Sequence, residues 1–223
     1  EMWTSAQAAR LIVEPQSDGS RRCTGVQVWT GKEMVTAHAA CEVVLSAGAI
    51  NSPQLLQLSG IGPAALLREH GVDVVHDLPG VGAHLHDHPD VVQVMDAPRL
   101  TDLFGLSLPG LGHLWNGVRE WRSRRTGMLT TNFAEAGGFI RSQPSEPVPD
   151  VQLHFVIGKL VDHGRKTVLG HGYSCHVCLL QPVSRGRVGL ASNNPLDLPL
   201  VDPNFLGERA DMDRMVHGFR RMR

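Results

Sequence analysis

Residues 48–62 read Gly-Ala-Ile-Asn-Ser-Pro-Gln-Leu-Leu-Gln-Leu-Ser-Gly-Ile-Gly and follow a short apolar run, Cys41–Ser46. The run has the composition of a buried strand such as those of a parallel sheet. After a turn of small residues, Ser52 can cap a helix whose first residue is Pro53, and Gly60 can end it. The buried side of that helix is expected to consist of Leu55, Leu56 and Leu58.

The same arrangement recurs directly afterwards. Pro63 can start a second helix that carries Leu66 and Leu67, and Gly71 can end it. A strand, a tight turn and a capped helix can bind an anion, because the helix N-terminus offers free N–H groups and the positive end of its dipole. The same unit is also common in purely structural α/β layers. The pattern alone leaves both interpretations open.

The segments on either side predict a mixed architecture. Alternating runs at 9–13 and 24–29, with a polar turn between them, indicate a β-hairpin. Apolar spacing predicts helices over 114–121, with an arginine-rich face in solvent, and over 212–222. Strand-like runs joined by turns occupy 137–140, 151–157, 173–183 and 187–190. The chain is therefore expected to combine an α/β part with an α+β part built on an antiparallel sheet.

Composition excludes several classes of protein. The 223 residues are 42% hydrophobic and 19% charged, which argues against a disordered or fibrous chain and allows one large domain or two small ones. Lys and Arg number 21 against 22 Asp and Glu, for a net charge of −1. This balance argues against a nucleic-acid-binding or polybasic membrane-surface protein. No apolar stretch reaches the ~20 residues of a transmembrane helix.

Two groups of residues, one of cysteines and one of histidines, could in principle bind a metal ion. Cys175 and Cys178 form a C-x-x-C, but on the expected strand they point to opposite faces. Sparse cysteines favour a reducing, cytoplasmic compartment, and association with a membrane is left open. His84, His86 and His88 would share one face of an extended segment and could then bind zinc. Pro89 and the preceding turn favour irregular structure there. A metal-binding protein that uses these histidines is one possible function of the chain. A stand-alone interaction domain is another.

The stretch 48–62 resembles the second signature of the glucose-methanol-choline (GMC) family of FAD-dependent oxidoreductases. Residues 77–82, Asp-Leu-Pro-Gly-Val-Gly, and the following 85–88 resemble another family element. Similar elements occur at 135–139, 182–188 and 202–206, and the resemblance is closest to the choline dehydrogenase-like alcohol dehydrogenases. His84 and His86 depart from the family's Asn and Gln, which puts the hydrogen bonds of those amides in doubt.

The resemblance implies FAD as cofactor, a small-molecule alcohol as substrate, and roles for particular residues. Ala8 matches a position whose backbone holds the FAD adenine. Ser46, Ala47 and Gly48 match the strand end and turn that pass close to the cofactor. Glu135 matches a glutamate that lies at the substrate cation in choline-oxidising relatives, where a carboxylate complements a quaternary ammonium. A structural role for Glu135 is equally open.

The resemblance also implies a domain division and an incomplete enzyme. Residues 1–98 match part of an FAD-binding, Rossmann-like domain, and 99–223 match part of a substrate domain with an antiparallel sheet. The G-x-G-x-x-G loop of the family is expected upstream and its catalytic histidine downstream, and this sequence contains neither motif. We therefore expect no catalytic residue in this chain and no alcohol oxidation by the chain alone.

Overall fold

The structure is a computed structural model that describes residues 2–99, 104–162, 165–166 and 168–223. It consists of two compact units. Unit 1 contains 1–87 and 185–205, and unit 2 contains 88–184 and 206–223. Each unit is therefore built from two separate stretches of the sequence. The assignment of 1–98 and 99–223 to two functional domains stays a prediction.

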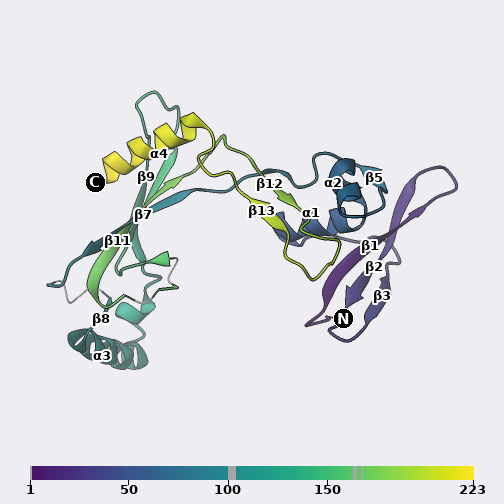
Figure 1. Cartoon of the computed structure of the whole chain (residues 1–223). Coiled ribbons are helices and arrows are strands. Elements are labelled where there is room, and N and C mark those ends of the chain that lie inside the picture. The colour runs from purple at the N-terminus through teal and green to yellow at the C-terminus, as the bar shows by residue number, and fades with distance from the viewer. Residues whose placement is uncertain (1, 100–103, 163–164, 167) are drawn as a thin grey trace. The chain divides into compact units, whose positions relative to one another are not determined.

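Unit 1 begins with a three-stranded antiparallel sheet in the order β1-β2-β3 (Figure 1). The strands are β1 (Gln7–Pro15), β2 (Arg21–Trp29) and β3 (Met34–His38). The pairing of β1 with β2 confirms the predicted hairpin. Ala9 and Leu11 are buried. The amide of Leu11 donates to Ser59 Oγ at 2.8 Å, which fixes β1 to the end of the following helix.

Two helices follow, as predicted: α1 (Gly48–Leu58) and α2 (Ala64–Glu69). The expected start of α1 is wrong, since Ala47 occupies the N-cap position and Pro53 lies inside the helix. The reason is the glycine before it: Gly48 has a φ of +86°, so the chain turns into the helix one turn earlier. Pro53 removes only one intrahelical donor, and the helix continues on both sides of it.

The predicted buried strand over Cys41–Ser46 is also wrong. The segment is irregular, and the side chain of Val44 is 74% exposed. An apolar run becomes a buried strand only when neighbouring strands supply hydrogen bonds and cover. No strand in the described part of the chain pairs with this segment. The parallel pairing in unit 1 is instead a short one, between β4 (Ile61–Gly62) and β5 (His76–Asp77).

The core of unit 1 joins α1 and α2 to a second three-stranded sheet. This sheet has the order β13-β12-β6 and consists of β6 (Ala83–Leu85), β12 (Gly186–Gly189) and β13 (Leu200–Asp202). Gln57 of α1 is fully buried, and its Nε2 donates to the carbonyls of Val81 at 3.2 Å and Val188 at 3.0 Å. A buried amide donor needs such acceptors. Gln57 therefore fixes α1 against β12. The apolar core contains Leu58, Leu67, Val72 and Leu190.

Unit 2 contains an antiparallel sheet in the order β7-β11-β10-β9. Its strands are β7 (Asp90–Asp96), β9 (Ala134–Ile140), β10 (Val151–Val156) and β11 (Gly170–Leu179), and the short β8 (Gly105–Leu106) also pairs with β11. Helix α4 (Arg209–Met222) lies along this sheet (Figure 1). Its Met215 packs on Val151, Val177 and Leu179. The predicted α+β character and C-terminal helix are confirmed.

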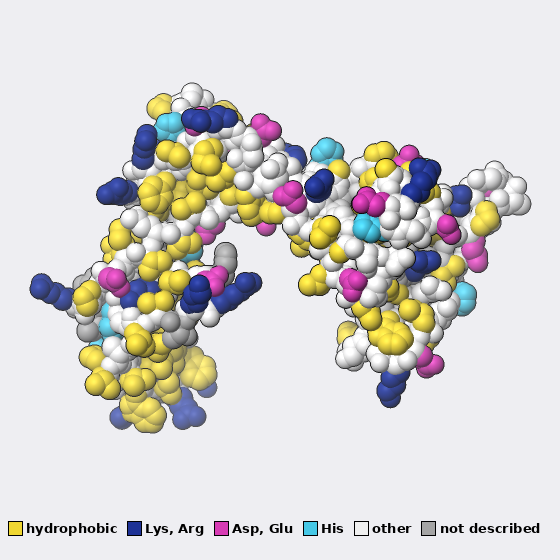
Figure 2. Space-filling view, in the orientation of Figure 1, with side chains coloured by type: hydrophobic (Ala, Val, Ile, Leu, Met, Phe, Trp, Pro, Cys, Tyr) yellow, Lys and Arg dark blue, Asp and Glu magenta, His cyan; other side chains and the backbone are white. Residues whose placement is uncertain are grey.

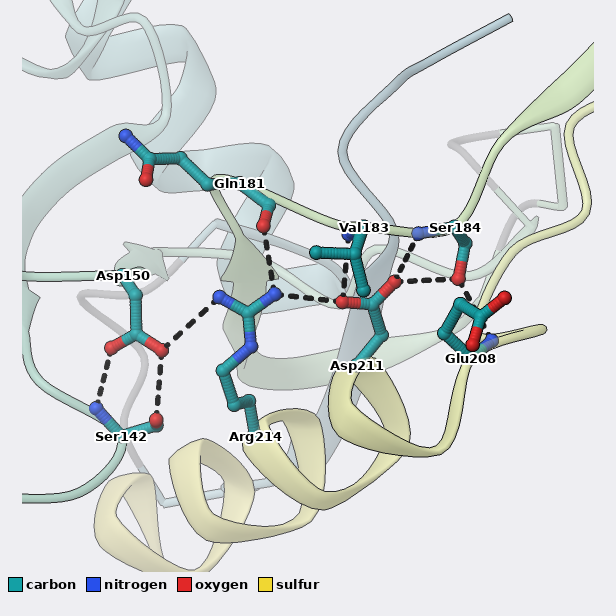
Figure 3. Close-up of polar contacts among 8 residues, drawn as sticks. All are labelled: Ser142, Asp150, Gln181, Val183, Ser184, Glu208, Asp211 and Arg214. Carbon is teal, nitrogen blue, oxygen red and sulfur yellow. Dashed lines mark hydrogen bonds and ion pairs between the residues drawn. The ribbon is translucent and has the colours of Figure 1, made fainter. Parts of the chain in front are cut away.

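A buried acid fixes the first turn of α4 to the loop that follows β11 (Figure 3). Asp211 is fully buried and accepts hydrogen bonds from the amides of Val183 and Ser184 and from Ser184 Oγ. Arg214, one turn along α4, also donates to Asp211, at 2.7 Å, and lies 3.7 Å from Asp150. Burial raises the pKa of Asp211, but the hydrogen bonds outweigh it and lower the pKa to about 2.

The predicted arginine-bearing helix is α3 (Leu108–Arg124), followed by the 3₁₀ turn η1 (Met128–Thr130). Ser107 caps α3 by accepting from the amide of Gly110 at 3.0 Å. Arg125, in the left-handed conformation, ends it. The arginines of this helix are solvent-exposed, as predicted.

Candidate functional site

The small-residue turn before α1 is the first part of the candidate site. Ser46 is exposed, Ala47 is the N-cap residue and Gly48 begins the helix. Within the described ranges no side chain caps this helix, so its first amide groups stay available. A Cβ at Gly48 would meet no atom within 4 Å, so the space beside the turn is open. These features suit an anionic or polar group placed against the helix N-terminus.

A pocket of about 440 Å³ lies beside this turn in unit 1. It brings together Ala8 of β1 and Ala47, two of the four residues predicted to contact a cofactor. Ser46 and Gly48 adjoin Ala47 in the chain but do not line the pocket. The other walls are formed by Ala6, Gln7, Asn51, Gln54, Leu55, Leu58 and the loop 195–198.

Two amide side chains hold the loop 195–198 in place. Gln7 Nε2 donates to the carbonyl of Pro195 at 2.6 Å, and Gln54 Nε2 donates to the carbonyl of Asp197 at 2.8 Å. Gln54 is only 8% exposed. The loop is therefore tied to both β1 and α1, and the pocket has a polar wall beside its alanines.

Sequence reasoning missed Asn51, Gln54 and the loop. Asn51 and Gln54 could have been found, because they follow Ala47 by four and seven residues and so share its face of the helix. The loop lies far along the chain and carries no motif that points to α1. Its place became visible only through its hydrogen bonds to Gln7 and Gln54.

Glu135 lies in unit 2, in β9, and is exposed. Ala134 is opposite Val156 and Ala136 is opposite Phe155, so Glu135 is the extra residue of a β-bulge. Bulges are frequent beside active sites, where they redirect a side chain. The neighbouring Ala134 lines a pocket of about 580 Å³ together with Phe104 and Phe133. The rings of these two residues meet edge to face, with their centroids 5.1 Å apart. Glu135 itself is not among the lining residues.

The histidine segment does not form the extended strand that the metal hypothesis requires. His84 has a φ of +61° and β6 ends at Leu85, so the alternation of side chains is broken. Among the residues that the structure describes, no three His, Cys, Asp or Glu side chains are placed to hold a metal ion. Cys175 and Cys178 lie on β11 as predicted, half-buried and buried respectively.

Comparison with known proteins gives two matches to the family described as GMC oxidoreductase. The N-terminal family model matches residues 1–90, and the C-terminal model matches 182–223. An alcohol dehydrogenase [acceptor] of Pseudomonas putida is 43% identical over 220 residues, which cover 97% of this chain and 39% of that protein. The mitochondrial choline dehydrogenase of Homo sapiens is 40% identical over 208 residues, covering 93% and 34%.

Solved structures agree. Formate oxidase of Aspergillus oryzae RIB40 superposes with a TM-score of 0.81 at 27% identity, covering 96% of this chain and 41% of that one. Pyridoxine 4-oxidase, at 21% identity and a TM-score of 0.72, shares the fold. The chain spans 34–41% of the length of the first three of these proteins.

Proposed function

The chain belongs to the GMC oxidoreductase family, and from that premise we propose that it supplies part of an FAD-dependent enzyme that oxidises the CH–OH group of an alcohol. The identity to an alcohol dehydrogenase and a choline dehydrogenase, over nearly all of this chain, supports the proposal. We assign residues 1–98 to the FAD-binding part and residues 99–223 to the substrate-binding part.

One observation carries the cofactor assignment: the pocket that joins Ala8 to Ala47 at the N-terminus of α1. The alanine side chains leave room for a flat ring, and the amides of Asn51 and Gln54 add polar groups at its wall. The open helix N-terminus favours a neighbouring anion. These residues fit the adenosine end of FAD. They would bind and orient the cofactor, while Ser46 and Gly48 shape the turn.

When bound, FAD supplies the hydride acceptor for alcohol oxidation. The part of this chain is to hold the cofactor and to place the alcohol. Glu135, the extra residue of the bulge in β9, is proposed to attract a cationic alcohol such as choline. The carboxylate complements a quaternary ammonium, and the pocket beside the neighbouring Ala134 contains the rings of Phe104 and Phe133, a type of surface that also attracts such a cation. No residue of this chain is assigned the proton transfer.

Replacing Ala47 with glutamate tests the cofactor site. The Ala47→Glu side chain would fill the pocket and place a negative charge at the helix N-terminus, so we expect FAD affinity to fall by at least about tenfold. Quenching of flavin fluorescence during titration of the protein measures this. Ala47→Ser, which keeps a small neutral side chain, is the control and should bind within about twofold of the original. Equal affinities for both variants would show that FAD does not occupy this pocket.

Replacing Glu135 with glutamine tests the substrate assignment. Loss of the charge should raise the KM for choline by roughly tenfold, about 1.4 kcal/mol, in the complete enzyme. The KM for a neutral alcohol of similar size should stay within about twofold, since it makes no ionic contact. Steady-state oxidation of both alcohols gives the comparison. If both KM values rise together, Glu135 has a structural role in the bulge and no contact with the cation.

A further inference from the structure

Helix α3 exposes a set of large apolar side chains. Leu108 is 87% exposed, Leu111 56% and Trp115 65%. These three residues follow one another by three and four positions, so they lie on one face of the helix. Leu106 and Leu169, joined by a β-bridge, are exposed as well. We refer to Leu106, Leu108, Leu111, Trp115 and Leu169 as the α3 patch. Contiguous exposed apolar surface of this kind marks an interaction site.

Within unit 2, two short elements contact α3. The helix packs on β8 and η1. Gly117 is buried there, facing Met128 and Leu129 of η1. Figure 2 shows hydrophobic side chains gathered over α3, with Lys and Arg at their edge. Leu106 and Leu111 line a small pocket together with Met128 of η1. The side chains of Leu108, Trp115 and Leu169 stay mostly exposed, and α4 lies along the sheet away from α3 (Figure 1).

The charges around this patch have one dominant sign. Arg119 and Arg122 continue the face of Trp115 toward the C-terminal end of α3, because they follow it by four and seven positions. Arg125 lies over the ring of Trp121, 4.3 Å from its centroid. The single acid of the helix, Glu120, accepts a hydrogen bond from Thr126. The chain as a whole is nearly neutral, so the positive charge is a local property of α3.

We infer that α3 binds the surface of a membrane that contains anionic lipids. Leucines with a tryptophan on one face of a helix, bordered by arginines, suit the boundary between acyl chains and head groups. Arginine beside that face complements anionic head groups, each contributing roughly a fivefold factor in binding. None of the described helices has the length and apolarity of a membrane span. With one apolar face and an arginine-bearing border, α3 suits a position in the plane of the surface. This inference is independent of the flavin assignment.

Sedimentation with sucrose-loaded vesicles tests the apolar contribution. The full chain should bind vesicles of phosphatidylcholine with 30% phosphatidylglycerol. Replacing Leu108, Leu111 and Trp115 with glutamine should lower the partition coefficient by at least about tenfold, because their insertion is lost. The control variant carries Phe139→Gln and Val148→Gln, which remove exposed apolar side chains elsewhere in unit 2 and should leave binding unchanged.

The arginines provide the second arm of the test. Arg119→Gln with Arg122→Gln should reduce binding to the anionic vesicles by roughly twenty-fivefold and leave binding to pure phosphatidylcholine unchanged. Arg220→Gln on α4 is the matched control. Equal binding by wild type and both α3 variants would overturn the inference. So would a dimer in sedimentation velocity that the three glutamines convert to a monomer, since the α3 patch would then be an interface between copies of this chain.

Discussion

Asp211→Asn is expected to lower the free energy of unfolding of unit 2 by about 3 kcal/mol. The carboxylate of Asp211 accepts from two backbone amides, one hydroxyl and Arg214, and it is fully buried. An asparagine has one acceptor oxygen, so its NH₂ group would face donors and leave buried groups unpaired. Among the described residues, Arg214, whose side chain is 13% exposed, would keep only Asp150 as an acidic partner.

The matched control is Asp213→Asn on the same helix. Asp213 is partly exposed and pairs with Arg209 at 2.9 Å in an i, i+4 contact, so its loss should cost less than about 0.5 kcal/mol. Urea unfolding measures both variants, and hydrogen exchange at the amides of Val183 and Ser184 locates the effect. Similar losses of stability for the two variants would mean that the hydrogen bonds of Asp211 contribute no more than a surface ion pair.

The same carboxylate sets an acid limit on the stability of unit 2. Because its pKa is lowered from 3.8 to about 2 in the fold, its contribution is complete above pH ~4 and is lost as the pH falls toward 2. A pKa shift of this size corresponds to about 2 kcal/mol of the free energy of unfolding. The wild type should therefore lose that amount more than Asp211→Asn between pH 4 and pH 2 in urea unfolding. Parallel pH profiles would contradict the assignment.

The elements predicted correctly depend on local pattern. Apolar residues at helical spacing indicated α3 and α4, and alternation with a polar turn indicated the β1–β2 hairpin. In α4 and the hairpin such a pattern follows from the burial of one face, whereas in α3 the same spacing leaves Leu108, Leu111 and Trp115 exposed. These patterns also gave the mixed fold class. The predicted start of α1 was wrong because the conformation of Gly48 outweighed the preference of Pro53 for the first turn of a helix.

The features that were predicted wrongly or missed depend on contacts between residues far apart in the sequence. Residues 41–46 have the composition of a buried strand, but composition does not say which neighbours are present to cover it. The pocket wall needs Gln54 to reach the carbonyl of Asp197, a contact between residues far apart in the sequence. The bulge at Glu135 depends on the register between β9 and β10. The resemblance to the family named Ala8 and the turn at 46–48, and helical spacing could have added Asn51 and Gln54, whereas no sequence signal connects the loop 195–198 to this pocket.

Gly82→Ala is expected to destabilise unit 1 by about 2–4 kcal/mol. Gly82 has a φ of +80°, and an added Cβ would meet the carbonyl oxygen of Val188 and the amide of Gln57. The backbone of β12 cannot yield easily there, because the amide of Val188 donates to the carbonyl of Gly82 at 2.7 Å. Gly80→Ala in the same turn is the control, since its Cβ would meet no atom within 4 Å, and it should change stability by less than about 0.5 kcal/mol. Urea unfolding with hydrogen exchange in β6 and β12 measures both. Because Gln57 fixes α1 to β12, Gly82→Ala should also weaken FAD binding at the N-terminus of α1. Equal stability of Gly82→Ala and Gly80→Ala would show that the close approach of Gly82 to Val188 and Gln57 does not hold α1 in place.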